Sequence, residues 1–536
     1  MRNLRLAIMP LVLILFQLAL MQQMYPLALN SNGLFGQDPA YQYLFAGVDI
    51  LLGNSPGHTD HPGTPLQTLI AAIIPFTWGV SRLVGATQFS TLNAVLANPE
   101  LYLASTSLVL LLCTACATYY LGCRVFQSTN RYLLALACQT TPLIFSAVAP
   151  HVIYPTPEAA LFFVSTLLMG AIAPFVFTND QTLSKSNYRQ AILVGVLCGV
   201  GFAIKVTFAP LLALLLILGK FRLICVAAIS MIVAWALGVL PIIKKVPQMF
   251  TWFYQVMSHT GAHGQGSSGI FNVAEFKLHL LWLLAVFPLF FYVFAAILIA
   301  LLILSFTKIQ ARASNLPILT GFRVPGVLLL IALTQTLMVA KHVGASYMIP
   351  ALPLALMAAS WLLHSESGLR LKVLTTNYFS AAWLLLLCIM MVFSTTKAYS
   401  VVRLNHEKGE QSYRVIRDEL AKFNDPLLIG TFNCNFKECA LWFGMLLVPI
   451  MELRMDKITP AFLHFDVFNK RLHLPGKGVV EPNEAIATIE SLLAQGRTIL
   501  LISPPYPQLA QFKLMPILDT PIQNLYRVTG MTRLTP

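Results

Sequence analysis

Residues 190–219 read QAILVGVLCGVGFAIKVTFAPLLALLLILG, two apolar runs that meet at a single lysine, Lys205. Apolar runs of about 20 residues, the length that crosses a bilayer as a helix, recur along most of the 536-residue chain. The composition agrees, because 57% of the residues are hydrophobic, only 10% are charged and the mean hydropathy is +0.72. The sequence therefore predicts a polytopic all-α transmembrane bundle, and the unbroken apolar runs exclude a membrane β-barrel.

The N-terminal segment MRNLRLAIMPLVLILFQLALMQQMYP carries Arg2 and Arg5 before an apolar run, which is typical of a signal or signal anchor. It has no clear small-x-small cleavage site, so we expect it to stay attached as the first span, with its basic end in the cytoplasm. Ten further spans are predicted at residues 100–122, 131–149, 158–177, 190–204, 206–219, 223–243, 278–304, 325–340, 346–363 and 377–395.

The run at residues 66–85 decides on which side each later loop lies. If it is an interfacial or re-entrant helix in the outer leaflet, the chain has about eleven spans and its outer loops hold few basic residues. The inner loops then hold Arg124, Arg131, Lys185, Arg189, Lys220, Arg222, Lys308, Arg312, Arg323, Arg370 and Lys372, and the outer ones only Arg82, Lys244, Lys245, Lys277 and Lys341. This asymmetry predicts a multi-pass protein of the cell (inner) membrane with a cytoplasmic N-terminus. The external segments are then 25–99, 150–157, 244–277 and everything after about 397.

The last 140 residues differ from the rest, because they contain 13 of the 21 acidic residues. Helix-like and strand-like segments alternate there: SYRVIRDELAKF, PLLIGTF, NEAIATIESLLAQG and RTILLIS. We predict a transmembrane catalytic domain at residues 1–396 and a small, soluble extracytoplasmic α/β domain at residues 397–536. Cys434 and Cys439 fall in this polar region, where an outside location would permit a disulfide, although both can equally be free.

The first external loop, SNGLFGQDPAYQYLFAGVDILLGNSPGHTDHPGTPLQ, combines aspartates and histidines with no lysine or arginine. Such a group can supply a general base if packing brings it to a substrate. Asp38 is the candidate base, and Asp60 and His61 are candidate substrate-binding residues. Taken singly, Asp38 can equally cap a short helix that begins at Pro39, and Asp60 can hold an Asx turn.

Two charged residues stand at predicted outer boundaries of spans. Glu158 begins the span at 158–177, where it can orient a substrate or simply cap the helix. Lys205 lies where two spans meet on the outer side. A lysine at that depth costs roughly 2.5 to 3.5 kcal/mol unless it snorkels to water or contacts an anion such as a lipid phosphate.

Two further external segments carry candidate ligands. His259 and His263 lie in the glycine-rich YQVMSHTGAHGQGSSGIFN, which favours a loop closing over a substrate, or an idle linker, over a helix that binds metal. The segment AKHVGASYMIPALPLAL places Lys341, His342 and Tyr347 at an outer boundary, where they can bind a phosphate or anchor the chain in the interface.

In the order of these motifs, roughly over residues 1–365, the chain resembles the GT-C superfamily of integral-membrane glycosyltransferases, of the protein mannosyltransferase and aminoarabinose transferase kind. Those enzymes transfer a sugar from a polyprenyl-phosphate carrier outside the cytoplasmic membrane, with an acidic residue of the first external loop as base. Asp38 matches that acid, and HPGTPLQ resembles the proline-containing loop that follows it. Glu158 is similar to the acid of the second external loop. Lys205 and KHVGASYMIPALP resemble the lysine and the basic, tyrosine and proline motif.

The resemblance implies a hexosyl- or pentosyltransferase. Asp38 would deprotonate the acceptor for an inverting displacement, and Lys205, Lys341 and His342 would stabilise the departing lipid phosphate. The partners implied are the polyprenyl-phosphate sugar, an extracytoplasmic acceptor (glycan, lipid or protein) and the bilayer, whereas no basic, aromatic-studded face indicates nucleic acid. Because Pro39 follows Asp38, the family's usual paired acids are absent. No metal or other cofactor is therefore indicated, although a divalent metal stays open.

Two rival functions remain. A polytopic lipid or glycan transporter, or flippase, would also need intramembrane ionisable groups, but it predicts inverted repeats and polar residues at span centres. A structural scaffold would explain the C-terminal domain but not the carboxylates and histidines of the external loops.

Overall fold

The computed structural model describes residues 4–24, 40–59, 63–146, 148–152, 154–178, 183–260, 266–269, 272–310, 323–342, 344–364, 377–431, 434, 436–445, 448, 462–466, 471–474, 478–504, 509 and 511–531. The chain forms two compact units. The helical unit comprises Met1–Ala19, Thr59–Leu66 and Ser107–Tyr399, and the sheet unit comprises Leu20–His58, Gln67–Thr106 and Ser400–Pro536. Asp38, Asp60, His61 and His263 lie outside the described residues.

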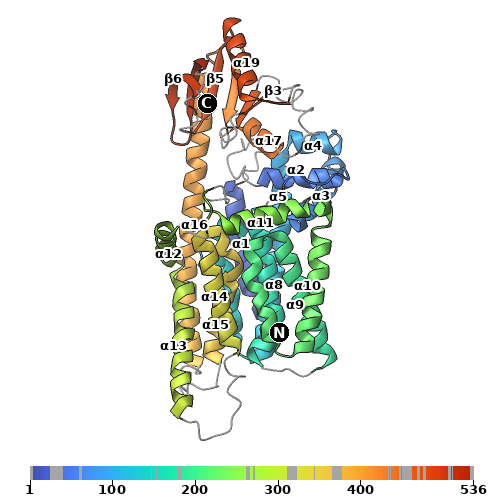
Figure 1. The fold of residues 1–536 in the computed structure, drawn as a ribbon, viewed down its shortest axis with the longest axis vertical. Helices are drawn as coiled ribbons and strands as arrows, with labels where there is room; N and C mark the ends of the chain where they lie inside the picture. Colours follow the sequence, from blue (N-terminus) through green and yellow to red (C-terminus); the bar gives the residue numbers. More distant parts are fainter. Residues whose placement is uncertain are drawn as a thin grey trace. The chain divides into compact units, whose positions relative to one another are not determined.

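Helices dominate the described part of the chain (Figure 1). With η for 3-10 helices, they are η1 Leu4–Ala7, α1 Ile8–Met24, α2 Gln42–Leu51, α3 Thr64–Leu83, α4 Thr91–Ala97, α5 Pro99–Thr129, α6 Tyr132–Gln139, α7 Thr141–Ile144, η3 Ala149–Val152, α8 Pro157–Phe177, α9 Lys185–Ile204, η4 Val206–Leu218, α10 Phe221–Gly238, η5 Leu240–Lys245, α11 Val246–Ser258, α12 Val273–Val286, α13 Pro288–Gln310, α14 Arg323–Lys341, η6 Ala345–Ala351, α15 Leu352–His364, α16 Asn377–Leu420, α17 Lys437–Met445 and α19 Pro482–Ala494.

Within the described residues, nine helical stretches are long and apolar enough to cross a membrane: η1 with α1, α3, α5, α8, α9, α10, α14, η6 with α15, and α16. The predicted polytopic helical bundle is therefore confirmed. The run at 278–304, predicted as one span, is instead part of two helices, α12 and α13, that bend by 96° at a break. Pro288 begins the second helix, because proline has no N–H with which to continue the first. Counted together, this pair makes a tenth candidate span.

The run at 66–85 forms α3, so the predicted helix is present. Its buried positions recur every three or four residues, at Leu66, Ile70, Ile74 and Thr77, as in a helix with one apolar face. Its mean hydropathy of 1.2 is lower than that of the other eight candidates. An interfacial or re-entrant placement of α3 stays a prediction.

Glycines of α9 bring neighbouring elements of the helical unit together. A Cβ added to Gly195 would lie 2.1 Å from the carbonyl oxygen of Ala227 in α10, so the two helices touch there through their backbones. A Cβ on Gly201 would lie 2.5 Å from the ring of Phe208 in η4. The chain therefore reverses at Lys205, and α9 and η4 pack against each other.

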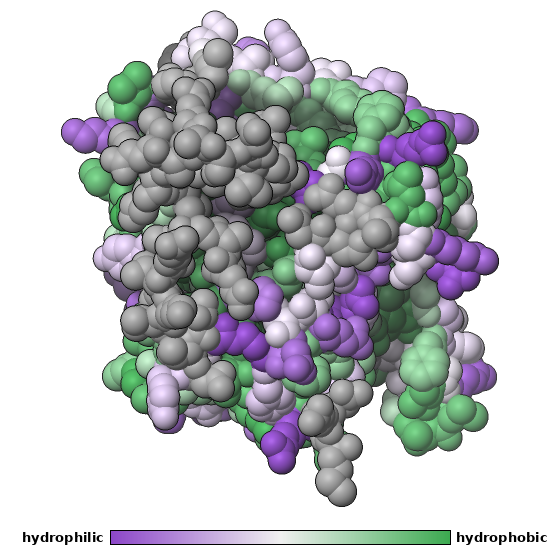
Figure 2. Space-filling view, turned by 90° about the horizontal axis from the view of Figure 1, so that it is seen from below, coloured by the Kyte–Doolittle hydropathy of each residue, from purple (hydrophilic) through white to green (hydrophobic). Residues whose placement is uncertain are grey.

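Basic residues gather at the other end of the helical unit. Arg131 donates hydrogen bonds to the Leu363 carbonyl at the end of α15 (2.7 Å) and to Ser380 Oγ at the start of α16 (2.9 Å). Figure 2 views this end from below and shows hydrophilic side chains among hydrophobic ones. The other described basic residues at these helix ends are Arg5, Arg124, Lys185, Arg189, Lys220, Arg222 and Arg323.

The sheet unit contains a seven-stranded sheet in the order β4-β3-β2-β1-β5-β7-β6. The strands are β1 Leu427–Thr431, β2 Phe462–Asp466, β3 Arg471–Leu474, β4 Gly478–Val480, β5 Ile499–Ser503, β6 Phe512–Asp519 and β7 Asn524–Met531. Strand β1 runs parallel to β2 and β5, and the remaining pairs are antiparallel. Residues Ala485 and Ile489 of α19 pack into an apolar core with Ile429, Phe465 and Leu501 from one face of the sheet.

The predicted C-terminal α/β domain is thus confirmed in its class. PLLIGTF and RTILLIS contain β1 and β5, and NEAIATIESLLAQG contains most of α19. The segment at 412–423 is not a separate helix, because its first nine residues form the end of the 44-residue α16. Cys434 and Cys439, whose state the sequence left open, form a disulfide.

Candidate functional site

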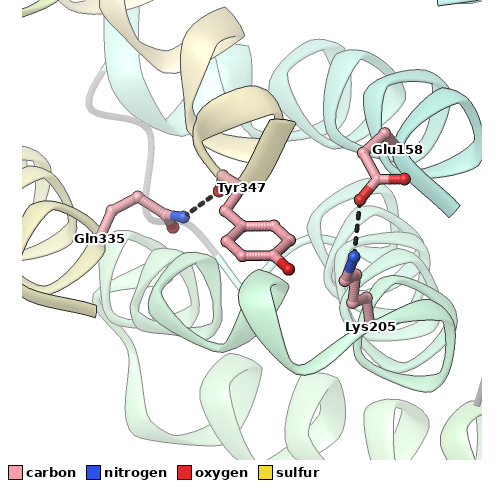
Figure 3. A network of polar contacts seen from close by, with 4 residues as sticks. All are labelled: Glu158, Lys205, Gln335 and Tyr347. Atoms are coloured by element: carbon pink, nitrogen blue, oxygen red, sulfur yellow. Dashed lines mark hydrogen bonds and ion pairs between the residues drawn. The ribbon is translucent and has the colours of Figure 1, made fainter. Parts of the chain in front are cut away.

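Glu158 and Lys205 form a buried ion pair in the helical unit. Lys205 Nζ lies 2.6 Å from Glu158 Oε1, and the two side chains are 6% and 8% exposed (Figure 3). Pro157 at the first position of α8 starts that helix, so Glu158 falls in its first turn, near the positive end of the helix dipole. Lys205 follows the last residue of α9 in an extended conformation (φ −161°), which releases its side chain from the helix.

Tyr347 of η6 covers the lysine of this pair. Its ring centroid lies 4.6 Å from Lys205 Nζ, within the range of a cation–π contact (Figure 3). Gln335 of α14 donates from Nε2 to the Tyr347 carbonyl oxygen at 2.8 Å, and thereby fixes the start of η6. The ring also packs on Gly344, where an added Cβ would lie 3.1 Å from it. Gln335 is a neutral polar residue inside a predicted span, and nothing in the sequence singles it out for this role.

His151 of η3 adds a titratable group beside the ion pair. Burial lowers the pKa of His151; the Glu158 carboxylate opposes this and the Lys205 ammonium adds to it. The imidazole is therefore neutral near pH 7 and does not compete with Lys205 for the carboxylate. His151 lies in the second segment predicted to be external, but no sequence pattern pointed to its role.

Two buried hydroxyls flank the ion pair in sequence. Thr156 Oγ1 precedes Glu158 by two residues, and Thr207 Oγ1 follows Lys205 by two. Neither has a hydrogen-bond partner among the described residues. A buried hydroxyl without a partner is costly, so both are available to a polar ligand or water. Because an ammonium has three N–H donors, Lys205 can bind a further oxygen while it keeps Glu158.

Lys341, His342 and His259 come together at a second place, the C-terminal end of α11. Lys341 Nζ donates to the Met257 carbonyl oxygen, and His342 Nε2 lies 2.8 Å from the Val256 carbonyl oxygen. His259 immediately follows α11. Basic side chains suit this position, because the last carbonyls of a helix have no partners within it.

The predicted site residues thus divide into three sets. Glu158, Lys205 and Tyr347 form one contact network, whereas Lys341, His342 and His259 surround the end of α11. Four others lie outside the described residues: Asp38, Asp60, His61 and His263. Within the described part of the chain, no group of three or more His, Cys, Asp or Glu side chains could hold a metal ion.

Comparison with known proteins gives a likeness of fold. No family model matches the sequence, and no curated protein matches it. A crystal structure of ArnT from Cupriavidus metallidurans bound to undecaprenyl phosphate is similar over 97% of this chain and 99% of that chain, with 11% identity and a TM-score of 0.50. The apo structure of that protein is similar over 96% and 97%, with 12% identity and a TM-score of 0.52. The chain therefore has a GT-C-like fold, as its motifs predicted.

Proposed function

We propose that this chain is an integral-membrane glycosyltransferase that takes a hexosyl or pentosyl group from a polyprenyl-phosphate carrier and transfers it to an extracytoplasmic acceptor. The observation that carries the proposal is the buried Glu158–Lys205 pair under Tyr347, at a boundary of the spanning helices. The GT-C-like fold supports it, because the similar ArnT structure holds undecaprenyl phosphate, a lipid of the same chemical class as the proposed carrier.

In the proposed mechanism the Lys205 ammonium binds the lipid phosphate. This ammonium is buried and contacts Glu158 and Tyr347. Two residues farther along the chain, the Thr207 hydroxyl has no hydrogen-bond partner in the part of the chain that the structure describes. Groups fixed in advance in a water-poor place stabilise a departing phosphate without having to reorganise. Lys341 and His342 would contribute further positive charge on the same side of the membrane. Glu158 would keep Lys205 oriented.

Acceptor activation is assigned to Asp38 on the evidence of the sequence. Its carboxylate would take the proton of the acceptor hydroxyl as that oxygen attacks the anomeric carbon, with inversion. Asp60 and His61 would orient the acceptor, and the glycine-rich segment with His259 and His263 would close over the substrate. A lipid phosphate is a good leaving group, so positioning and charge stabilisation suffice without a metal.

The proposed location is the cell (inner) membrane, with the N-terminus in the cytoplasm. Eight described basic residues, Arg131 included, lie at the helix ends near Arg131. Those at the opposite end, near Lys205, are fewer: Lys205 itself, Lys244, Lys245, Lys277 and Lys341. The basic end of a membrane bundle usually faces the cytoplasm. The disulfide between Cys434 and Cys439 supports an extracytoplasmic sheet unit, because disulfides persist in oxidising compartments.

The test is transfer by the purified, full-length protein in sealed proteoliposomes, supplied with polyprenyl-phosphate hexoses and pentoses and with membrane extract as acceptor. We expect labelled sugar to leave the lipid carrier, Asp38→Asn to abolish the transfer while carrier binding persists, and a chelator to leave the rate unchanged. Movement of the intact lipid-linked sugar across the bilayer, without cleavage of its phosphate bond, would instead indicate the rival flippase function.

A further inference from the structure

Helix α17 is fixed to one face of the sheet in the sheet unit. The Cys434–Cys439 disulfide joins its first turn to the chain that follows β1. Cys439 Sγ packs so closely on β1 that a Cβ added to Gly430 would lie 2.4 Å from it. Farther along the helix, the fully buried Trp442 packs on His473 of β3, with ring centroids 5.6 Å apart. The helix therefore has little freedom to move relative to the strands.

The opposite side of α17 contacts α2, which lies in the first segment predicted to be external. At Gly444 the helices are so close that an added Cβ would lie 2.6 Å from the ring of Phe45 and 2.9 Å from Tyr41 Cβ. Only glycine fits this approach without displacing α2. Lys437, at the start of α17, donates a hydrogen bond to the Ala97 carbonyl oxygen at the end of α4.

The start of α2 is in turn tied to the start of α5. Tyr41 Oη donates to Glu100 Oε1 at 2.7 Å, and the two residues are 1% and 6% exposed. A buried hydrogen bond to a carboxylate is among the stronger polar contacts. Helix α2 is thus held at Tyr41 from two directions, by Glu100 and by Gly444. Neither the ion pair nor the end of α11 accounts for this arrangement.

We propose that the C-terminal domain serves as a positioning element: α17, fixed to the sheet by its disulfide, sets the place of α2 through Gly444, with Tyr41 and Glu100 as the second support. The proposal rests on the proposed function, because Asp38, the proposed base, precedes α2 by four residues. Displacement of a catalytic group by about 1 Å can cost roughly 100-fold in rate. Gly444 is therefore a positioning residue for acceptor activation and not for binding of the lipid phosphate.

The test compares Gly444→Ala with Gly79→Ala in the full-length protein. Both glycines lie in helices, but a Cβ at Gly79 meets nothing within 4 Å. We expect Gly444→Ala to lower kcat by about 10- to 100-fold while leaving the KM for the lipid-linked sugar unchanged. Hydrogen exchange should quicken in residues 42–51 and stay constant in β1. The Gly79→Ala control should match the wild type, and Phe45→Leu should restore kcat in the Gly444→Ala background.

Three outcomes would overturn the inference. Unchanged exchange in residues 42–51 would show that α17 does not hold α2. A parallel loss of kcat and donor affinity would indicate general damage, as would failure of Phe45→Leu to rescue. If the wild-type protein transfers no sugar, the proposed function fails instead. The exchange measurement then still decides whether α17 positions α2.

Discussion

The Glu158–Lys205 pair makes a quantitative prediction through a double-mutant cycle of Lys205→Met, Glu158→Leu and the double variant. Opposite charges 2.6 Å apart attract by roughly 6 kcal/mol at an effective dielectric constant of about 20. The cost of removing both ions from water offsets much of that attraction. When only one partner is removed, the other is left buried and unpaired, so each single substitution should lower the free energy of unfolding by about 3–5 kcal/mol. The double variant should lie within about 1 kcal/mol of the wild type, because two apolar side chains fill the same space without a buried charge.

This cycle should distinguish the effect of the ion pair on stability from its effect on carrier binding. We expect thermal unfolding in one detergent to show low midpoints for both single variants and a recovered midpoint for the double variant. Carrier binding, measured with polyprenyl phosphate, should be lost in Lys205→Met and should stay lost in the double variant. A double variant as unstable as either single one would refute the argument from burial. A double variant that binds and transfers normally would show that the pair has only a structural role.

The other predictions concern three separate features. The pKa of His464 is lowered to about 3 and that of His473 to about 4, mainly by burial, so both are buried neutral. Below pH 6.5 both histidines become protonated in the unfolded chain, whereas they stay neutral in the folded domain. Each histidine should therefore lower the free energy of unfolding of the domain by about 2 kcal/mol at pH 5. The loss should be seen as lower hydrogen-exchange protection factors in β2 and β3, and it should be absent in a double His→Leu variant. Tyr347→Leu should lower the free energy of unfolding by the energy of a cation–π contact, about 1–2 kcal/mol, in a thermal-unfolding measurement, whereas Tyr347→Phe should not, because its ring keeps the contact with Lys205. With an impermeant thiol reagent on intact cells, Lys244→Cys should react and Lys220→Cys should not; the reverse pattern would invert the proposed topology.

The helical part of the fold was largely predictable because a membrane span leaves a strong signal. A run of about 20 apolar residues has few alternatives, and rare charges stand out against it. Glu158 and Lys205 were identified as candidates for this reason. Their contact could not be predicted, because it joins residues 47 apart and depends on where α9 ends. Gln335 and Thr207 were missed because neutral polar residues are common in helices and carry no comparable signal.

The sheet unit was harder to predict. Strands β1 and β5 are parallel neighbours buried on both faces, and such strands read as continuous apolar runs. In contrast, β2 and β3 are four or five residues long and each contains a histidine, so they resemble loops in sequence. The two histidines are buried because they lie opposite each other on neighbouring strands and pack against Trp442. That environment is a product of the tertiary fold and leaves no local pattern.

The energetics of the ion pair favour a functional role over a structural one. Replacing a buried pair with apolar side chains of similar size is often neutral or stabilising, so stability alone gives little reason to keep two charges in an apolar bundle. Here the pair stands where α9 ends and α8 begins, and the hydroxyls of Thr156 and Thr207 beside it in sequence lack partners within the described residues. Two such hydroxyls, each two residues from a charge of the pair, are explained if a third, anionic group binds at this place. A phosphate on a lipid is such a group, and it would reach this depth with its prenyl chain in the bilayer.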